Sequence, residues 1–92
     1  MDELTETKTL RLKNKLGMHA RAAASFVKVA QRFKSKVYIE HNGQIVDGTS
    51  ILDILTVACP CGGKLTIKAV GTDADAAVEE LAKLIENKFG EE

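Results

Sequence analysis

A histidine and an arginine lie two residues apart in the stretch KLGMHARAAASFVK, which covers residues 15–28. After them, apolar residues recur at the spacing of one helix face, at Ala23, Phe26, Val27, Ala30 and Phe33. His19 therefore lies at or beside the N-terminus of a predicted helix. The free backbone N–H groups of Ala20, Arg21 and Ala22, together with the positive end of the helix dipole, favour an anion there.

The imidazole of His19 could perform chemistry at such an anion site. Histidine is a poor N-cap compared with Ser, Thr, Asp or Asn, so capping alone does not explain its presence. A neutral imidazole nitrogen can attack phosphorus and hold a phosphoryl group covalently. The guanidinium of Arg21 offers a planar set of donors to phosphoryl oxygens. The residues alone leave a second interpretation open, in which His19 is an ordinary surface residue at a helix end and Arg21 is solvated.

A second helix start is predicted near Ser50. Ser50 with Asp53 three residues later resembles a capping box. The residues near the two predicted helix starts are more apolar than a short surface helix needs, at Met18, Ile51, Leu52 and Leu55. In one interpretation Leu52 and Leu55 simply face the sheet, which is expected of one or two of these four residues.

Two cysteines flank a proline in CPCGG, residues 59–63, and invite a metal or redox interpretation. A structural zinc site takes four ligands, whereas only Cys59, Cys61 and His41 are on offer. The spacing is also not the Cys-x-x-Cys of thiol redox motifs. We expect free cysteines at the end of a helix that Pro60 terminates, and we assign no metal and no other cofactor.

Predicted strands and helices must position these side chains. Alternating apolar residues predict strands at 7–13, 36–41, 44–47 and 64–70, with Asn42-Gly43 as a hairpin turn. Helices are predicted from Ala20, after Ser50 and after Thr72 or Asp73. The order β-α-β-β-α-β-α predicts an α+β fold, an open-faced β-sandwich in which three helices cover one face of a four-stranded, mainly antiparallel sheet. Residues 1–92 form one predicted domain, in which 1–6 are a flexible N-terminal extension.

Composition excludes several kinds of function. The chain has 13 basic and 13 acidic residues, no Trp and one Tyr, so neither a net positive field nor an aromatic platform favours nucleic acid. No stretch approaches the ~20 apolar residues of a membrane-spanning helix, so no membrane insertion is expected. The polar, acidic start MDELTETK is unlike a secretory signal and predicts a cytoplasmic protein.

The segment LGMHAR (16–21), followed by AAASFVK, resembles the active-site segment of HPr, the histidine-containing phosphocarrier family of the bacterial phosphotransferase system. The likeness runs from about Thr7 to Lys88 and includes EHNGQIV (40–46), GTSILDIL (48–55) and GGKLTIKAVGTDADAAVEEL (62–81). It implies that His19 receives a phosphoryl group from enzyme I, that Arg21 stabilises it, and that downstream proteins accept it. Such a protein is a carrier and not an enzyme.

The resemblance implies further roles. Ser50 aligns with a serine that HPr kinase/phosphorylase modifies in many bacteria, although the nearby charge of Asp53 opposes a phosphate there. Those of Met18, Ile51, Leu52 and Leu55 that do not face the sheet would form an exposed patch on which partner proteins dock. The proline that usually follows the family's arginine is Ala22 here, which restores one N–H donor and loses some rigidity.

Two alternatives remain beside the sugar-transport phosphocarrier. One is a regulatory paralogue of HPr that serves a nitrogen-related branch. The other, from a different class of protein, is a small thiol- or metal-binding module that uses Cys59 and Cys61. A carrier that exposes its site to successive partners is expected to act as a monomer.

Overall fold

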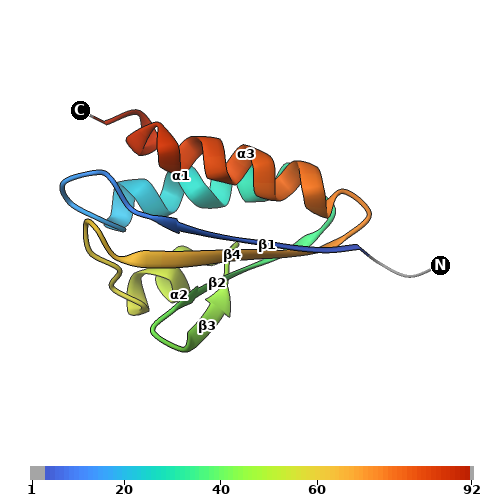
Figure 1. Ribbon diagram of the computed structural model, residues 1–92, viewed down its shortest axis with the longest axis horizontal. Coiled ribbons are helices and arrows are strands. Elements are labelled where there is room, and N and C mark those ends of the chain that lie inside the picture. The colour runs from blue at the N-terminus through green and yellow to red at the C-terminus, as the bar shows by residue number, and fades with distance from the viewer. Residues whose placement is uncertain (1–3, 92) are drawn as a thin grey trace.

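The computed structural model describes residues 4–91 and shows an antiparallel sheet with helices in the order β-α-β-β-α-β-α (Figure 1). The strands are β1 (Leu4–Arg11), β2 (Lys36–His41), β3 (Gln44–Asp47) and β4 (Lys64–Gly71). The helices are α1 (Ala20–Ala30), α2 (Ile51–Thr56) and α3 (Ala74–Glu86), followed by a 3₁₀ turn, η1 (Lys88–Gly90). The predicted α+β fold and its element order are confirmed.

The four strands form one sheet in the order β1-β4-β2-β3, with every neighbouring pair antiparallel. Leu10 pairs with Leu65, and Ile39 pairs with Ile67, so apolar side chains of adjacent strands lie on the same face. These residues are buried, whereas the alternate positions are mostly polar. The period of two therefore divides the sheet into a core face and an open face.

The two longer helices cover the core face of the sheet. α3 packs against β1 and β4, and α1 lies beside α3 (Figure 1). The short α2 contacts α1 and β3, so it lies at the β3 side of the sheet. Residues of α1 and α3 that contribute fully buried side chains are Ala22, Ala23, Phe26, Ala74, Ala77, Leu81 and Ile85.

Strand β1 begins three residues earlier than the sequence predicts. Residues 4–6, expected to belong to a flexible extension, pair in β1 with Gly71, Val70 and Ala69 of β4. Their side chains are exposed, which is why no apolar alternation marks them. Backbone pairing with a long neighbouring strand is sufficient to order them. Residues 1–3 of the predicted extension lie outside the described residues.

Helix α2 ends before the position that the sequence predicts. Its last residue is Thr56, and the chain turns at Ala58, whose φ is +48°, so Pro60 is not the terminator. Ile54, which was not among the apolar residues singled out from the sequence, is the buried residue of this helix. A helix of six residues has too few turns for its spacing to reveal which side faces the core.

The predicted hairpin turn and the predicted N-cap position of α3 are both present. Asn42 and Gly43 have φ of +51° and +82° between the paired residues His41 and Gln44, as a two-residue hairpin requires. Asp73 is the N-cap residue of α3, but its carboxylate bonds elsewhere. It accepts hydrogen bonds from the backbone N–H groups of Lys34 and Ser35, each at 2.9 Å.

Candidate functional site

His19 is the N-cap residue of α1. Its backbone is extended, with φ −91° and ψ 179°, and its side chain makes no capping hydrogen bond. The first intrahelical bond runs from the Ala23 N–H to the His19 carbonyl at 2.8 Å, so the N–H groups of Ala20, Arg21 and Ala22 precede it. The first turn contains no acidic residue. The helix end is therefore open to an anion, as the sequence predicts.

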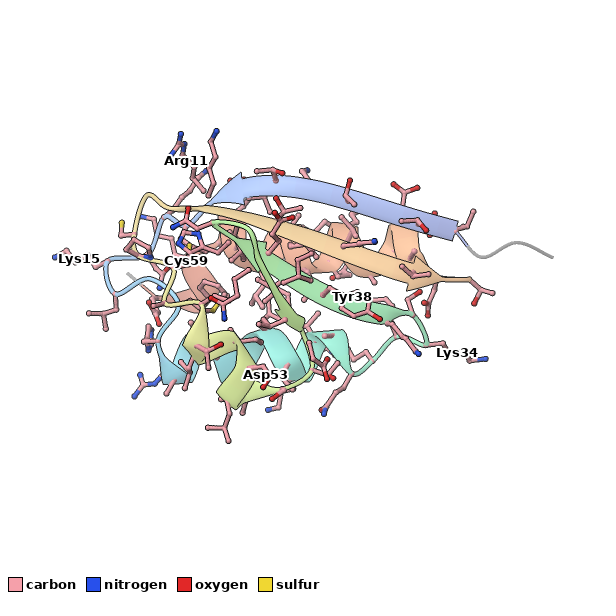
Figure 2. All side chains as sticks on the ribbon, turned by 90° about the horizontal axis from the view of Figure 1, so that it is seen from below. Arg11, Lys15, Lys34, Tyr38, Asp53 and Cys59 are labelled. Atoms are coloured by element: carbon pink, nitrogen blue, oxygen red, sulfur yellow. The ribbon has the colours of Figure 1, made fainter. Side chains whose placement is uncertain are left out.

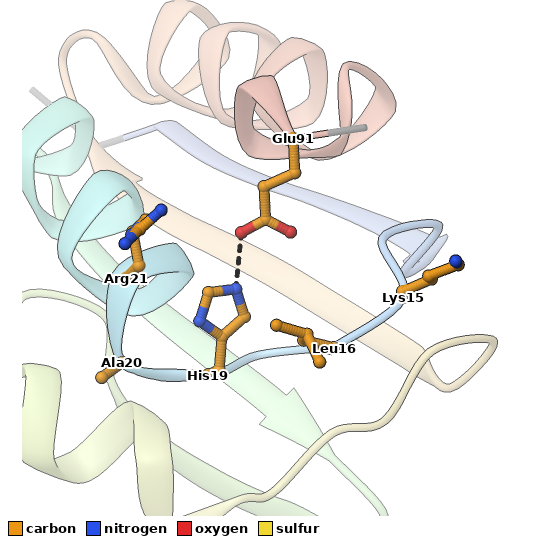
Figure 3. Close-up of a pocket in the computed structure, with 6 residues that line it drawn as sticks. All are labelled: Lys15, Leu16, His19, Ala20, Arg21 and Glu91. Carbon is orange, nitrogen blue, oxygen red and sulfur yellow. Dashed lines mark hydrogen bonds and ion pairs between the residues drawn. The ribbon is translucent and has the colours of Figure 1, made fainter.

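A pocket of about 650 Å³ surrounds this helix end. It is lined by Lys15, Leu16, His19, Ala20, Arg21 and Glu91 (Figure 3). Three of these residues can carry a positive charge, and one is a carboxylate from the C-terminal end of the described chain. Of the predicted site residues, His19, Ala20 and Arg21 meet in this pocket.

Glu91 is the part of the site that sequence reasoning missed. Its Oε2 lies 2.5 Å from His19 Nε2, and the two side chains are 22% and 25% exposed, respectively. Its Oε1 accepts a hydrogen bond from Asn14 Nδ2 at 3.1 Å. Burial opposes ionisation of Glu91, but the hydrogen bonds from Asn14 and His19 and the nearby charges of His19 and Arg21 together hold its pKa below the usual value. Glu91 is therefore a carboxylate at neutral pH.

The carboxylate of Glu91 determines which nitrogen of the His19 ring carries the proton. A carboxylate can only accept hydrogen bonds, so the Nε2 of His19 must be the donor. In the neutral ring the proton is then on Nε2, and Nδ1 carries the free lone pair. Nδ1 points toward the first turn of α1 (Figure 3).

The loop before His19 packs against the Cys-Pro-Cys segment and is hydrogen-bonded to it. The Met18 N–H donates to the Cys59 carbonyl at 2.9 Å. Gly17 has a φ of +66°, and a Cβ there would lie 2.6 Å from the same carbonyl oxygen, so only glycine fits. Figure 2 shows Lys15 and Cys59 at the same end of the molecule, opposite Lys34. The segment 59–61 thus supports the backbone that carries His19.

The cysteines themselves differ in environment. Cys59 is buried, and this burial raises the pKa of its thiol, while Cys61 is exposed. Within residues 4–91, no group of three His, Cys, Asp or Glu side chains could hold a metal ion. Cys59 is thus a packing residue under the site.

Met18 does not belong to an exposed apolar patch, contrary to prediction. It is 4% exposed and part of the hydrophobic core. The irregular loop before α1 places Met18 inward and leaves Leu16 outward, 72% exposed and lining the His19 pocket. Neither helical nor strand spacing applies to such a loop, so the sequence did not distinguish the two residues.

The apolar residues of α2 differ in exposure. Leu52 is 77% exposed, and Ile51 is 38% exposed, whereas Leu55 packs partly against the core. The alternative interpretation, in which Leu52 faces the sheet, is therefore wrong, because Ile54 occupies the buried side of α2. Leu52 is exposed, as its predicted place in a docking patch requires. Leu16, just before α1, and Ile51 and Leu52, in the first turn of α2, are large apolar side chains that remain exposed.

Ser50 caps α2 as the sequence predicts. Its Oγ accepts a hydrogen bond from the Asp53 N–H at 3.2 Å. In a full capping box, the side chain of Asp53 would in turn accept a hydrogen bond from the Ser50 N–H. Here the Ser50 N–H donates instead to the Asp47 carbonyl at 3.3 Å. Ser50 is half-buried, and Asp53 lies in the first turn of the same helix.

The fold and the site define a small α+β protein that presents one histidine at an open helix N-terminus, which is an arrangement suited to carrying a phosphoryl group. Residues 6–87 match the protein-family profile described as "PTS HPr component phosphorylation site". The chain therefore belongs to the HPr family of phosphocarrier proteins of the phosphotransferase system. It is a carrier of phosphoryl groups and not an enzyme, and its family partners include enzyme I.

Named relatives agree with this assignment. The chain is 41% identical over 78 residues to the phosphocarrier protein HPr of Cupriavidus necator, covering 85% of this chain and 88% of the relative. It is 39% identical over 85 residues to HPr of Treponema pallidum, covering 92% and 97% of the two chains. A crystal structure of HPr from Thermoanaerobacter tengcongensis superposes with a TM-score of 0.91 at 39% identity, covering 95% and 98%.

One further property concerns membranes. No helix within residues 4–91 has both the length and the apolar character needed to cross a bilayer.

Proposed function

We propose that His19 is the residue that accepts the phosphoryl group from phosphorylated enzyme I and donates it to downstream proteins. The observation that carries this proposal is the placement of His19 at the N-cap of α1, with Nδ1 facing the first turn (Figure 3). In the transfer, the Nδ1 lone pair attacks phosphorus and forms a P–N bond. The bond between phosphorus and the donor group breaks, and its electron pair stays on the donor. The proton on Nε2 remains there throughout.

Arg21 and the helix end supply the positive charge that a phosphoryl group requires. Arg21 lines the pocket and is exposed, so its guanidinium is free to bind phosphoryl oxygens as a bidentate donor. The N–H groups of Ala20, Arg21 and Ala22 add backbone donors at the positive end of the dipole. Ala22 keeps the N–H that a proline would lack.

Partner proteins dock beside His19 on apolar side chains. Leu16 of the pocket and the exposed Leu52 and Ile51 of α2 support such a surface. The chain is proposed to act as a monomer, because successive partners must reach the same pocket, and the cytoplasm is its expected location. Its balanced charge gives no field for nucleic acid.

Regulatory phosphorylation of Ser50 by an HPr kinase/phosphorylase is a second candidate function. The position of Ser50 at a helix N-terminus supports it, and the carboxylate of Asp53 opposes it. The test is incubation with ATP and such a kinase, followed by mass spectrometry of the Ser50 peptide. An unmodified peptide under conditions that modify a known substrate would contradict the proposal for that kinase.

The test of the main proposal uses enzyme I from the same organism and labelled phosphoenolpyruvate. We expect an acid-labile, base-stable label on the wild-type chain and none on His19→Ala. A His41→Ala variant is the matched control, because it removes the other histidine of the chain. Label that persists in His19→Ala would overturn the proposal.

Two further measurements separate the alternatives. The role as a nitrogen-branch paralogue is decided by which acceptor protein removes the label from His19. Metal that is retained through purification only when Cys59 and Cys61 are intact would support the thiol-module alternative.

A further inference from the structure

We infer that Glu91 is a positioning residue for phosphoryl transfer: its carboxylate, held by Asn14, fixes the His19 ring with Nε2 engaged and Nδ1 presented to the helix N-terminus. This inference rests on the proposed role of His19. Three observations carry it: the contact itself, the way Asn14 holds the carboxylate, and the backbone that brings the tail to the pocket.

The contact uses one oxygen for the ring and the other for Asn14. Oε2 lies 2.5 Å from His19 Nε2, and Oε1 lies 3.1 Å from Asn14 Nδ2 (Figure 3). With both oxygens engaged, the carboxylate plane is constrained in two directions. A ring that donates from Nε2 to a fixed acceptor loses its freedom to rotate about χ2.

Asn14 is itself fully buried, so it can hold Glu91 in one place. The Nδ2 group of Asn14 also donates to the Gly17 carbonyl at 2.7 Å, which ties it to the loop before His19. Its Oδ1 is buried and has no hydrogen-bond partner among the described residues. Leaving a buried acceptor unsatisfied destabilises the folded state. The two hydrogen bonds of its NH₂ group, to Gly17 and to Glu91, join the loop before His19 to the tail.

The backbone after α3 is built to return Glu91 to the pocket. Lys88, Phe89 and Gly90 all have positive φ, at +56°, +57° and +78°. The left-handed conformation is unfavourable for residues other than glycine. Phe89 is buried, 8% exposed, and belongs to the core, which offsets this cost and anchors the turn. The Glu91 N–H then bonds to the Lys88 carbonyl at 2.9 Å.

The arrangement resembles the carboxylate–histidine pairs of other sites, in which the acidic residue sets the tautomer and orientation of the ring. Here the carboxylate comes from the tail, 72 residues away along the chain. It touches the ring nitrogen that does not react, so it acts through His19 and not on the phosphoryl group. Its loss should slow transfer while leaving the nucleophile itself in place.

The test compares Glu91→Ala with Glu79→Gln, a control that removes the same charge from an exposed position of α3 outside the pocket. We expect Glu91→Ala to lower the rate of phosphorylation by enzyme I about three- to fivefold, the effect of losing a partly exposed charged pair. The melting temperature should remain close to that of wild type, because the tail residue supports no core packing. Glu91→Gln, which keeps a neutral oxygen acceptor, should recover part of the rate.

A proton NMR spectrum supplies the readout that a merely structural role would not change. The wild type should show a downfield, slowly exchanging ring N–H resonance from His19, present in Glu79→Gln and absent in Glu91→Ala and His19→Ala. Absence of this resonance from the wild type, or equal phosphorylation rates for wild type and Glu91→Ala, would overturn the inference. Label on His19→Ala would instead overturn the proposed function, so the two failures are distinguishable.

Discussion

At the scale of single residues, the site combines one nucleophile with the guanidinium of Arg21 and the free backbone N–H groups at the start of α1. His19 presents Nδ1 toward the free N–H groups of α1, and Arg21 lines the same pocket. Glu91 engages the opposite ring nitrogen. The proposed roles of the three side chains are therefore distinct, since His19 bonds to phosphorus, Arg21 binds the phosphoryl oxygens, and Glu91 orients the ring.

Replacing Arg21 tests its proposed role in binding the phosphoryl oxygens. We expect Arg21→Ala to lower the rate of phosphoryl transfer from enzyme I about tenfold, because a charge-assisted hydrogen bond to the phosphoryl group contributes about 1.5 kcal/mol or more. Arg21→Lys should recover only part of the loss, since lysine lacks the planar pair of donors. The measurement is the initial rate of label incorporation. Arg32→Ala, which removes an exposed charge beyond the other end of α1, is the control, and equal rates for both alanine variants would contradict this role.

At the scale of elements, the short helix α2 separates two functions on its two sides. Ile54 is fully buried, whereas Leu52 is 77% exposed. The first belongs to the core, and the second is free to contact a partner protein. The pair can therefore be used to distinguish folding from docking.

We expect Leu52→Glu to raise the KM for phosphoryl transfer with little change in melting temperature, because an exposed side chain is replaced by a charged one within a docking surface. Ile54→Ala should behave in the opposite way and lower the free energy of unfolding by about 2–5 kcal/mol through a core cavity. The measurements are transfer kinetics and thermal unfolding. A large loss of stability in Leu52→Glu would show that Leu52 supports the fold.

The turn η1 is the second element with a separable role. Phe89→Ala should lower the free energy of unfolding by about 3 kcal/mol and also release Glu91, so that the His19 ring N–H resonance disappears. Ile85→Ala, which changes a buried residue of α3, is the matched control, since it weakens the core without loosening the turn. The spectra are compared at a temperature where both variants are folded. Retention of the resonance in Phe89→Ala would show that Phe89 does not hold the tail.

At the scale of the whole molecule, Asp73 connects two loops at the end opposite the pocket. Its carboxylate accepts hydrogen bonds from the Ser35 hydroxyl at 2.5 Å and from the Lys34 and Ser35 N–H groups. The Ser35 hydroxyl first, and then the Lys34 N–H, lower the pKa of Asp73 below its usual value near 3.8. The ionised carboxylate thus joins the α1–β2 loop to the N-terminus of α3.

This lowered pKa predicts the acid dependence of stability. A carboxyl group whose pKa is depressed by folding stabilises the folded state above its unfolded pKa, and the contribution disappears as pH falls through the folded pKa. We therefore expect Asp73→Asn to melt below wild type at pH 7 and the difference to shrink below about pH 4. Thermal melts across the acid range up to neutral pH give the measurement. Asp75→Asn, two positions along the chain, is the control, and a constant difference between Asp73→Asn and wild type across this range would contradict the prediction.

Local patterns in the sequence were sufficient for the element order, the Asn42-Gly43 hairpin and the helix start at His19, because each depends on neighbours within a few residues. They also placed His19 and Arg21 together. They were insufficient where the chain is irregular: Met18 is inside, and Leu16 is outside. They likewise missed the pairing of residues 4–6, because nothing in these side chains indicates it.

The sequence by itself determined the fold class and the histidine at the start of the first helix, since helix periodicity and capping preferences are local properties. Only the tertiary structure decided that Glu91 and Asn14 meet at the His19 ring, from positions 77 residues apart along the chain. That meeting depends on the path of α3, the left-handed turn at Phe89 and the burial of Asn14. Contacts over such separations arise from the packing of the whole chain, and no local spacing encodes them.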